Sequence, residues 1–317
     1  MTSLSTFDFL KNSLPEGGFH LSDEQLKSLQ HTLFLMLQDI STLAEENGIP
    51  LYLSGGTVLG AVRHGGFIPW DDDIDVNLER KYYDRFFSLL RTQRADTYWL
   101  HTPESTPDYG ILSSRIRLKG SDVRQREDSY SSECGVCIDL TPVENVPDNP
   151  VLYALQGVLC MGSGFLLSCR KFYRDRESLR PLFQGSSGSR AAFALKCSVG
   201  LLVSWGSVDF WTHSTRKAYS LCHNDRSKRV AIPAGRRHFF RETYRRSSFC
   251  GGEKILFEGR PFFCTSDPGQ YMTALFGPGY MEIPSPEKRE QHVFFSFSPN
   301  SDVLTDTSGS ADEVRQG

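Results

Sequence analysis

The sequence predicts an α/β (α+β) fold, with a small mixed sheet flanked by helices and a helical middle region. Apolar residues recur at helical spacing between residues 22 and 47. Short apolar runs beside glycine or proline turns indicate strands at residues 51–53, 70–76 and 135–139. Two long apolar runs between residues 151 and 211 predict the helices of the middle region.

The composition of the 317 residues is that of a soluble globular protein. Apolar residues make up 39% and charged residues 23%, which excludes disordered and fibrous classes for the bulk of the chain. The net charge of −3 points to no class of partner. The first residues have neither a basic region nor an apolar core typical of a secretory signal, so we expect a cytoplasmic protein with reduced cysteines.

The first predicted helix has clear signals at both ends. Ser22 is a suitable N-cap, with Gln25 three residues later as in a capping box, and Asn47-Gly48 is a suitable stop. A second helix is predicted at 80–90, where aromatic and leucine residues form an apolar stripe. Strands are expected at 98–101 and 111–119.

A strand, a tight turn and a helix follow one another from residue 51. The apolar run 51–53 enters a Ser-Gly-Gly turn at Gly55 and Gly56, and Thr57 opens a short helix that ends near Arg63. The N–H groups at the start of such a helix point at a common centre and favour an anion there. We therefore expect this turn to hold phosphate.

Four aspartates lie between residues 71 and 75. In a strand over 70–76, alternation places Asp71, Asp73 and Asp75 on one face and Ile74 and Val76 on the other. Neighbouring carboxylates repel each other unless a cation lies between them, and their hard oxygens suit Mg²⁺ or Mn²⁺. An acidic surface turn is the alternative, but solvated loops rarely interleave apolar residues with acids.

Charged residues also occur in two of the later strands. Asp139 ends the apolar run 135–139, where an ionised side chain is costly to bury without a cation or a strong donor. An aspartate that caps the turn at Thr141 is the alternative. Arg115 and Arg117 share one face of the strand over 111–119. Either the strand is half-exposed, or its basic residues form a row that faces a diphosphate.

The glycine and aspartate motifs resemble those of the LicD family, in the nucleotidyltransferase superfamily. The match runs through Gly55-Gly-Thr57, Gly60-Ala-Val-Arg-His64 and Gly66-Phe-Ile-Pro-Trp-Asp-Asp-Asp-Ile-Asp75. A second match is the apolar strand with a central aspartate, followed by a proline, at Asp139. A third touches residues 256–292, where Phe276 and Pro278 depart from the family pattern.

The resemblance implies a nucleotidyltransferase-like fold and a set of site residues. Asp139 becomes the third carboxylate, beside Asp73 and Asp75, of a catalytic site that holds Mg²⁺ or Mn²⁺. Arg63 and His64, together with the Gly55-Gly56-Thr57 turn, are implied to contact the nucleotide or its phosphates. Anchoring of the loop at Trp70 is the alternative role for Arg63 and His64.

The resemblance also implies a reaction. LicD-like proteins transfer phosphocholine from CDP-choline to a hydroxyl of a surface glycan precursor, such as a lipopolysaccharide or teichoic-acid precursor or another lipid-linked glycan. The fukutin-related proteins of animals use a CDP-polyol. Two alternatives remain open, namely a nucleotidyltransferase that releases pyrophosphate and a catalytically silent module that binds a nucleotide or a glycan.

The middle region carries no family motif, and we expect the specificity for alcohol and acceptor to lie there. The run 151–169 has no charged residue, yet glycine, serine and glutamine dilute it, which favours buried or membrane-surface helices over a membrane span. Eight basic residues between 226 and 246 favour phosphates or an anionic lipid surface, with a solvated face as the alternative, and not nucleic acid. A peripheral contact with the inner face of the membrane is therefore a second expectation.

The chain is accordingly divided into five segments. They are a helical lead-in (1–47), a catalytic core (48–150), the helical, partly apolar and basic middle region (151–249), a family segment that completes the core (250–297) and a disordered tail (298–317).

Overall fold

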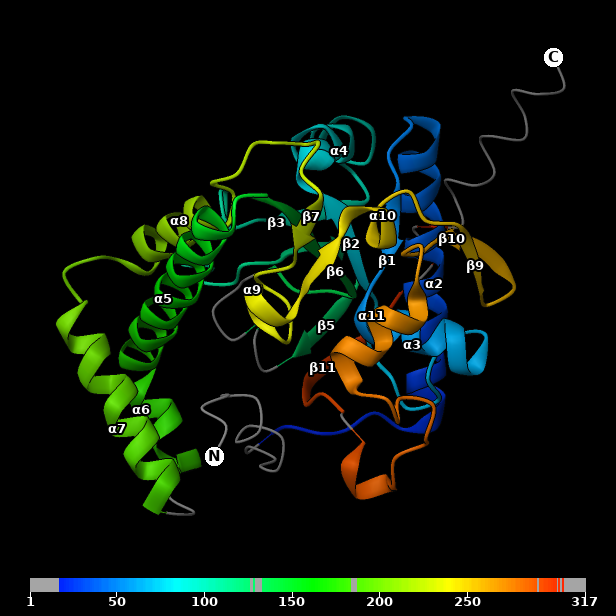
Figure 1. The fold of residues 1–317 in the computed structure, drawn as a ribbon. Helices are drawn as coiled ribbons and strands as arrows, with labels where there is room; N and C mark the ends of the chain where they lie inside the picture. Colours follow the sequence, from blue (N-terminus) through cyan, green and yellow to red (C-terminus); the bar gives the residue numbers. More distant parts are fainter. Residues whose placement is uncertain are drawn as a thin grey trace, which may run out of the picture. The chain divides into compact units, whose positions relative to one another are not determined.

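The computed structural model of the chain forms two compact units (Figure 1). It describes residues 17–125, 128, 133–183, 187–289, 291–300, 302 and 304. The sheet unit contains the described residues of 16–101, 114–143 and 244–317, and the helical unit those of 102–113 and 144–243. Most of the predicted disordered tail lies outside the described residues.

The sheet unit is built on a mixed sheet, as the sequence predicts. Its strand order is β3-β4-β6-β2-β1-β10-β9, in which β6 pairs with β2 and β1 with β10 in parallel, whereas the other pairs are antiparallel. The strands are β1 (Leu51–Leu53), β2 (Asp75–Glu79), β3 (Tyr98–His101), β4 (Ser114–Leu118), β6 (Cys137–Val146), β9 (Lys254–Phe257) and β10 (Arg260–Phe263). A separate antiparallel pair joins β5 (Asp122–Gln125) to β11 (Phe294–Ser298).

Helices flank this sheet. The first, α2 (Asp23–Glu46), has the predicted capping box between Ser22 and Gln25 and packs against β1. The second predicted helix is α4 (Arg80–Gln93), which packs against β2 and β3. The others are α3 (Gly55–His64), α10 (Arg246–Phe249), α11 (Pro268–Phe276) and a 3₁₀ turn (Pro286–Lys288).

Three predicted strand boundaries were wrong. β2 begins at Asp75 instead of residue 70, because the preceding aspartates form a loop in which the Asp71 N–H bonds to the carbonyl of Ile68. β4 begins at Ser114 instead of residue 111. β6 continues through Pro142 to Val146, beyond the predicted end at 139.

Pro142 is tolerated inside β6 because of where the neighbouring strands end. β4 pairs with β6 only as far as Leu140, and β7 (Arg229–Ala231) pairs with it from Glu144 onward. On that edge, Pro142 therefore lies in the gap between two ladders, where its missing N–H removes no strand-to-strand bond.

The helical unit is mostly helical, as expected for the middle region. Its core includes Val146, Cys160, Tyr219, Ala231 and Phe239. The long helix α5 packs against α7, α8 and α9. Its helices are α5 (Pro150–Arg174), α6 (Arg176–Leu179), α7 (Ser187–Leu202), α8 (Val208–Tyr219) and α9 (His238–Arg241), with a 3₁₀ turn (Arg180–Phe183), and β8 (Thr243–Arg245) leads into the sheet unit.

One glycine of α3 is required by a close backbone contact. A Cβ atom at Gly60 would lie 2.4 Å from the carbonyl oxygen of Gly66 and 3.2 Å from the nitrogen of Ile68. Because both neighbours belong to the backbone, neither can rotate away. This contact sets the path of the chain from α3 into the aspartate loop.

We predict that Gly60→Ala lowers the free energy of unfolding by about 1–3 kcal/mol, since the added methyl group overpacks the contact with Gly66. Urea denaturation followed by circular dichroism measures the change. Gly162→Ala is the control, because a Cβ there meets nothing within 4 Å, and better helix propensity should leave stability unchanged or raise it. Equal stability of Gly60→Ala and wild type would contradict the packing argument.

Candidate active site

A row of polar residues crosses four strands on one face of the sheet. In the strand register His101 is beside Arg115, Arg115 is beside Asp139, and Asp139 is beside Asp75. Residues in register point to the same face, and adjacent strands are about 4.8 Å apart. The parallel pairing of β2 and β6 therefore brings together two carboxylates that are far apart in the sequence.

The aspartate loop divides its side chains between two faces. The predicted alternation is confirmed by burial, although residues 71–74 are not in a strand. Residues 72, 74 and 76 are buried, whereas residues 71, 73 and 75 are partly exposed. Asp73 and Asp75 therefore lie on the same side of the chain as predicted.

Asp72 lies on the buried side and holds His292. Its Oδ1 is 2.6 Å from Nδ1 of His292, and its Oδ2 accepts the backbone N–H of His292 at 3.0 Å. Ligand atoms of Asp72, Asp73 and His292 lie within 4.8 Å of one another, close enough to share one cation. Sequence reasoning gave neither Asp72 nor His292 a role, although Asp72 is the one carboxylate that alternation places among apolar residues.

Arg115 supplies a strong donor to Asp139, which is partly exposed. Its Nε donates to Oδ1 of Asp139 at 2.9 Å, and its Nη1 donates to Asp128 at 3.0 Å. Arg117 also pairs with Asp128 and donates to the carbonyl of Gly135. Both arginines are buried with carboxylate partners, so β4 is not the half-exposed strand that its sequence suggested, whereas a row that faces a diphosphate stays a prediction.

The glycine turn lies directly against two of the carboxylates. Gly55 has a φ of +49°, and a Cβ there would be 2.7 Å from Oδ2 of Asp75. A Cβ at Gly56 would be 3.0 Å from Oδ2 of Asp71. The two glycines thus allow both carboxylates to approach the N-terminus of α3, where the helix dipole favours negative charge.

Hydrogen bonds fix the turn to the start of β2. The Oγ1 of Thr57 accepts the N–H of Asp75 at 2.9 Å, and the N–H of Ser54 donates to the carbonyl of Asp75. The hydroxyl of Tyr271 accepts the N–H of Gly55 at 3.2 Å and is 3.0 Å from Oγ of Ser54. The side chain of Thr57 is thereby committed to Asp75, whereas phosphate binding by the backbone of this turn stays a prediction.

Arg63 and His64 contact the protein itself. Nη1 of Arg63 donates to the carbonyls of Tyr280 and Glu282, at 2.9 and 3.1 Å. The ring of His64 stands edge-on to Trp70, with centroids 6.3 Å apart, and the Arg63 guanidinium is 6.0 Å from the same ring. These contacts favour the anchoring role for both residues, and their predicted contact with the nucleotide stays a prediction.

Burial and crowded negative charge raise the pKa values of two aspartates. Burial, followed by Asp73 and Asp72, raises the pKa of Asp71 well above its usual range. Burial, followed by the charges of Asp73 and Asp139, does the same to the pKa of Asp75. The nearby His292 opposes both shifts only in part, so the site fits a bound cation.

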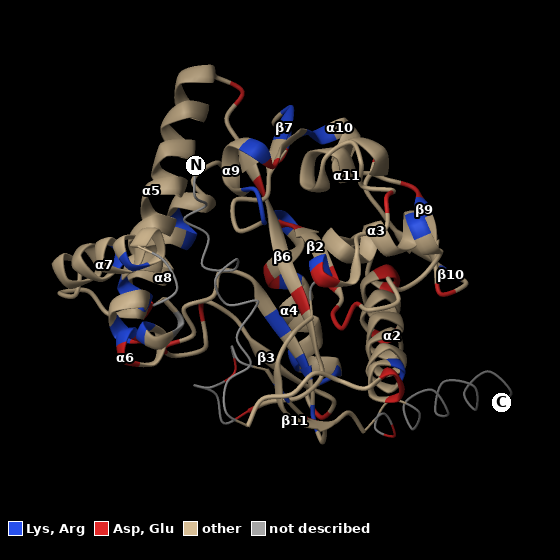
Figure 2. Cartoon of the chain, turned by 90° about the horizontal axis from the view of Figure 1, so that it is seen from below, with Lys and Arg blue, Asp and Glu red and all other residues tan. Residues whose placement is uncertain are grey.

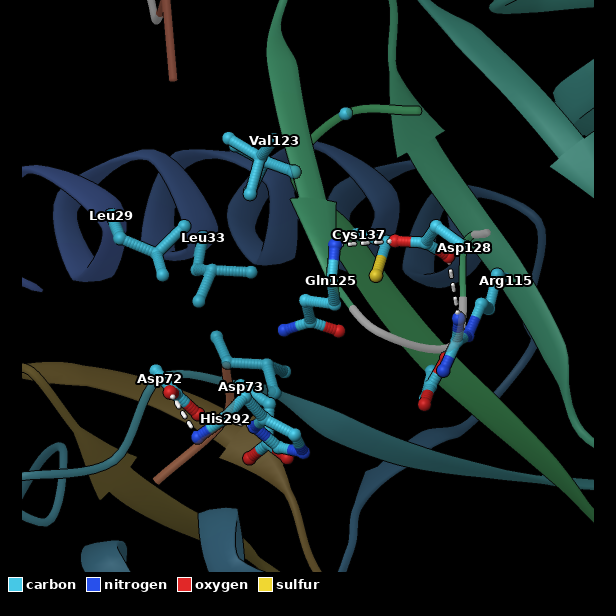
Figure 3. Close-up of a pocket in the computed structure, with 14 residues that line it drawn as sticks. Leu29, Leu33, Asp72, Asp73, Arg115, Val123, Gln125, Asp128, Cys137 and His292 are labelled. Atoms are coloured by element: carbon cyan, nitrogen blue, oxygen red, sulfur yellow. Dashed lines mark hydrogen bonds and ion pairs between the residues drawn. The ribbon is translucent and has the colours of Figure 1, made fainter. Parts of the chain in front are cut away.

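A small pocket in the sheet unit joins these groups (Figure 3). Figure 3 shows Asp72, Asp73 and His292 together on one side, with Arg115 and Asp128 on the other. The cavity volume is about 30 Å³, enough for an ion or one or two waters. Its lining includes Asp73 and Asp139, so two of the three predicted metal ligands face the same space.

Comparison with known proteins identifies the same part of the chain. Residues 48–147 match the family described as LicD/FKTN/FKRP, nucleotidyltransferase domain. The chain is similar to the lipopolysaccharide cholinephosphotransferase LicD of Haemophilus influenzae, with 33% identity over 132 residues, which is 41% of this chain and 49% of that protein. A segment of 34 residues, 11% of this chain and 7% of the relative, is 50% identical to ribitol 5-phosphate transferase FKRP of Homo sapiens.

A third relative is an uncharacterized protein of Rickettsia prowazekii, 41% identical over 64 residues, which cover 18% of this chain and 24% of that protein. The chain thus spans about half the length of the Haemophilus protein and a quarter or less of the other two.

We predict that Asp75→Asn stabilises the metal-free protein at neutral and alkaline pH. A raised folded-state pKa means that the native protein binds more protons than the unfolded chain, so wild-type stability falls as the pH rises above the usual range of Asp. The variant should gain about 1.4 kcal/mol at pH 8 for each unit by which the pKa is raised. Denaturation in EDTA at pH 5, 6.5 and 8 measures this.

Asp122→Asn is the control with the opposite sign. Hydrogen bonds from Cys134 and Ser296 lower the pKa of Asp122, so the ionised side chain stabilises the native protein. The variant should therefore become less stable than the wild type as the pH rises. If both variants showed the same trend with pH, charge crowding at Asp75 would be refuted.

Proposed function

Since the chain carries a LicD family domain at residues 48–147, we propose that it transfers a phosphorylated alcohol, phosphocholine or a related group, from a CDP-alcohol to a hydroxyl. The proposed acceptor is a cell-surface glycan or a lipopolysaccharide, teichoic-acid or other lipid-linked glycan precursor. The similarity to the Haemophilus and human relatives, a cholinephosphotransferase and a ribitol 5-phosphate transferase, supports this reaction class.

One observation carries the proposal. Asp75 lies against Gly55 at the start of α3 and beside Asp139 in the sheet, Asp73 and Asp139 line one pocket, and all three lie inside the family-matched segment. Transfer of a phosphoryl group depends on charge neutralisation and positioning more than on a covalent catalyst. Carboxylates beside a helix N-terminus provide both, because they can hold a cation where the first-turn N–H groups can hold a phosphate.

The residues fit Mg²⁺ or Mn²⁺ as a cofactor. Hard oxygen donors suit these ions, and the raised pKa values of Asp71 and Asp75 indicate that positive charge is needed among them. We propose Asp73, Asp75 and Asp139 as the ligands. When bound, the ion neutralises the charge that develops on the diphosphate.

In the proposed step, the oxygen of the acceptor hydroxyl forms a bond to the phosphorus that carries the alcohol. The bond from that phosphorus to the bridging oxygen breaks, and CMP leaves with the electron pair. Arg115 holds Oδ1 of Asp139, and we assign to Oδ2 either a place in the ligand set or acceptance of the hydroxyl proton. The N–H groups of Gly56 and Thr57, in the first turn of α3, have no intrahelical acceptor and are assigned to the phosphate oxygens.

Two other functions make different predictions. A nucleotidyltransferase, which the name of the matched domain favours, would attack the phosphorus next to the nucleoside and release pyrophosphate. A silent binding module would bind a nucleotide without turnover, and the presence of all three carboxylates speaks against it. Product analysis therefore separates the three functions.

We predict CMP release when the protein is incubated with Mg²⁺, an acceptor extract and a panel of CDP-alcohols. Asp73→Asn and Asp139→Asn should each lower turnover about a hundredfold or more. Each removes a carboxylate that holds the cation, and the cation stabilises the charge of the transition state. Asp96→Asn, an exposed acid between α4 and β3, is the control and should not change turnover. Pyrophosphate as the product, or full activity of Asp73→Asn, would refute the proposal.

We also predict that Mg²⁺ or Mn²⁺ raises the thermal midpoint of the wild type, and more at pH 8 than at pH 5.5, because protons compete for the same carboxylates. Differential scanning fluorimetry with added metal or EDTA measures the shift. Asp73→Asn should lose most of it and Asp96→Asn should retain it. An equal shift in the two variants would place the ion elsewhere.

A further inference from the structure

The N-terminal half of α5 has an apolar face that none of the described residues of the helical unit covers. Val151, Leu152, Leu155, Val158 and Leu159 are each more than half exposed. Their spacing places them on one side of the helix. Soluble domains rarely expose a contiguous apolar surface of this kind, and where they do it usually marks an interaction site.

The other side of this half of the helix is packed against protein. Gln156 is buried and donates to the carbonyl of Tyr219 at 2.9 Å. At Gly157, a Cβ would lie 2.2 Å from the ring of Phe240 in α9. By length and composition, α5 could cross a membrane. A helix that is tied to its neighbours along one side cannot be surrounded by lipid, so α5 is suited to lie along a surface.

Basic residues lie on the segments next to the N-terminal half of α5, outside its apolar face. Lys228 is exposed, and its backbone N–H bonds to Asp148 just before α5 begins. The guanidinium of Arg229 is 4.2 Å from the ring centroid of Tyr153 in α5. Arg241 is exposed at the end of α9, which packs against α5. Figure 2 shows the first turns of α5 without charged residues and a basic residue on the neighbouring α9.

The net charge of the helical unit also favours an anionic partner. Its segments 102–113 and 144–243 contain fifteen Lys and Arg against nine Asp and Glu, a net charge of +6 in a chain whose total is −3. An anionic surface is attracted to such a region. A symmetric dimer through this face would instead bring two regions of +6 together, which disfavours a second copy of the chain as the partner.

We propose that the apolar face of α5 binds the surface of an anionic lipid bilayer, with α5 lying in the interface and the basic residues beside it contacting lipid phosphates. Apolar side chains on one face and basic residues next to them are the features of interfacial helices. The proposal does not depend on the reaction that the sheet unit catalyses.

Flotation of the full-length protein with vesicles tests this. We expect binding to vesicles of phosphatidylcholine with 30% phosphatidylglycerol, weak binding to phosphatidylcholine alone, and loss of binding at high salt. The double variant Leu155→Glu/Val158→Glu should bind at least about tenfold more weakly, since it removes apolar contacts and adds repelled charges. Lys228→Gln/Arg241→Gln leaves the helix intact and should weaken binding about fivefold for each charge removed.

Leu256→Glu/Ile283→Glu is the matched control, because it replaces two exposed apolar residues of the sheet unit with the same charges. It should bind vesicles like the wild type. Wild-type binding by both of the other double variants, or equal binding to neutral vesicles, would overturn the proposal. Resistance to alkaline carbonate extraction would show a spanning helix, and a wild-type dimer that becomes monomeric in Leu155→Glu/Val158→Glu without any vesicle binding would show a second copy. Either result also overturns it.

Discussion

Repulsion among carboxylates at one end of the sheet is the constraint around which the sheet unit is arranged. The parallel pairing of β2 and β6 sets Asp75 beside Asp139, and the loop before β2 adds Asp71 and Asp73. Burial and mutual repulsion raise the pKa values of Asp71 and Asp75. Four acids in one place cost stability in the absence of positive charge, so the surrounding residues have to reduce that cost.

Three neighbouring features do so in different ways. Arg115 donates to Asp139, and Asp128 accepts hydrogen bonds from both Arg115 and Arg117. Gly55 and Gly56 have no side chains, and a Cβ atom at either position would crowd the carboxylate of Asp75 or Asp71. Both carboxylates can therefore approach the positive end of α3. These contacts leave part of the negative charge of the aspartates unbalanced. A divalent cation that binds a diphosphate needs such unbalanced negative charge in its site.

The candidate active site and the apolar face of α5 lie in different units of the chain. The sheet unit carries most of the family-matched segment with its carboxylates, and Asp72 in that segment bonds to His292 near the C-terminus. The helical unit shares only residues 102–113 and 144–147 with the matched segment, and it has the apolar face of α5 and an excess of basic residues. The chemistry and the attachment to a surface can therefore be tested separately.

The sequence by itself determined the helices, the turn and the candidate acids. The capping box of α2 and the division of residues 71–76 between two faces were predictable because they depend on neighbours a few residues away. Motif resemblance identified Asp139, which is far from Asp75 in the sequence. Only the pairing of β2 with β6 brings these two residues together. Such pairing has no local signal.

Only the tertiary structure decided what the remaining charged residues do. Arg115 looked like a phosphate ligand on an alternating strand, yet it is buried between Asp128 and Asp139. His292 had no visible role until the fold placed it against Asp72. Periodicity shows which way a side chain points, but the partner that meets it comes from a distant part of the chain, and the balance of charge depends on that partner.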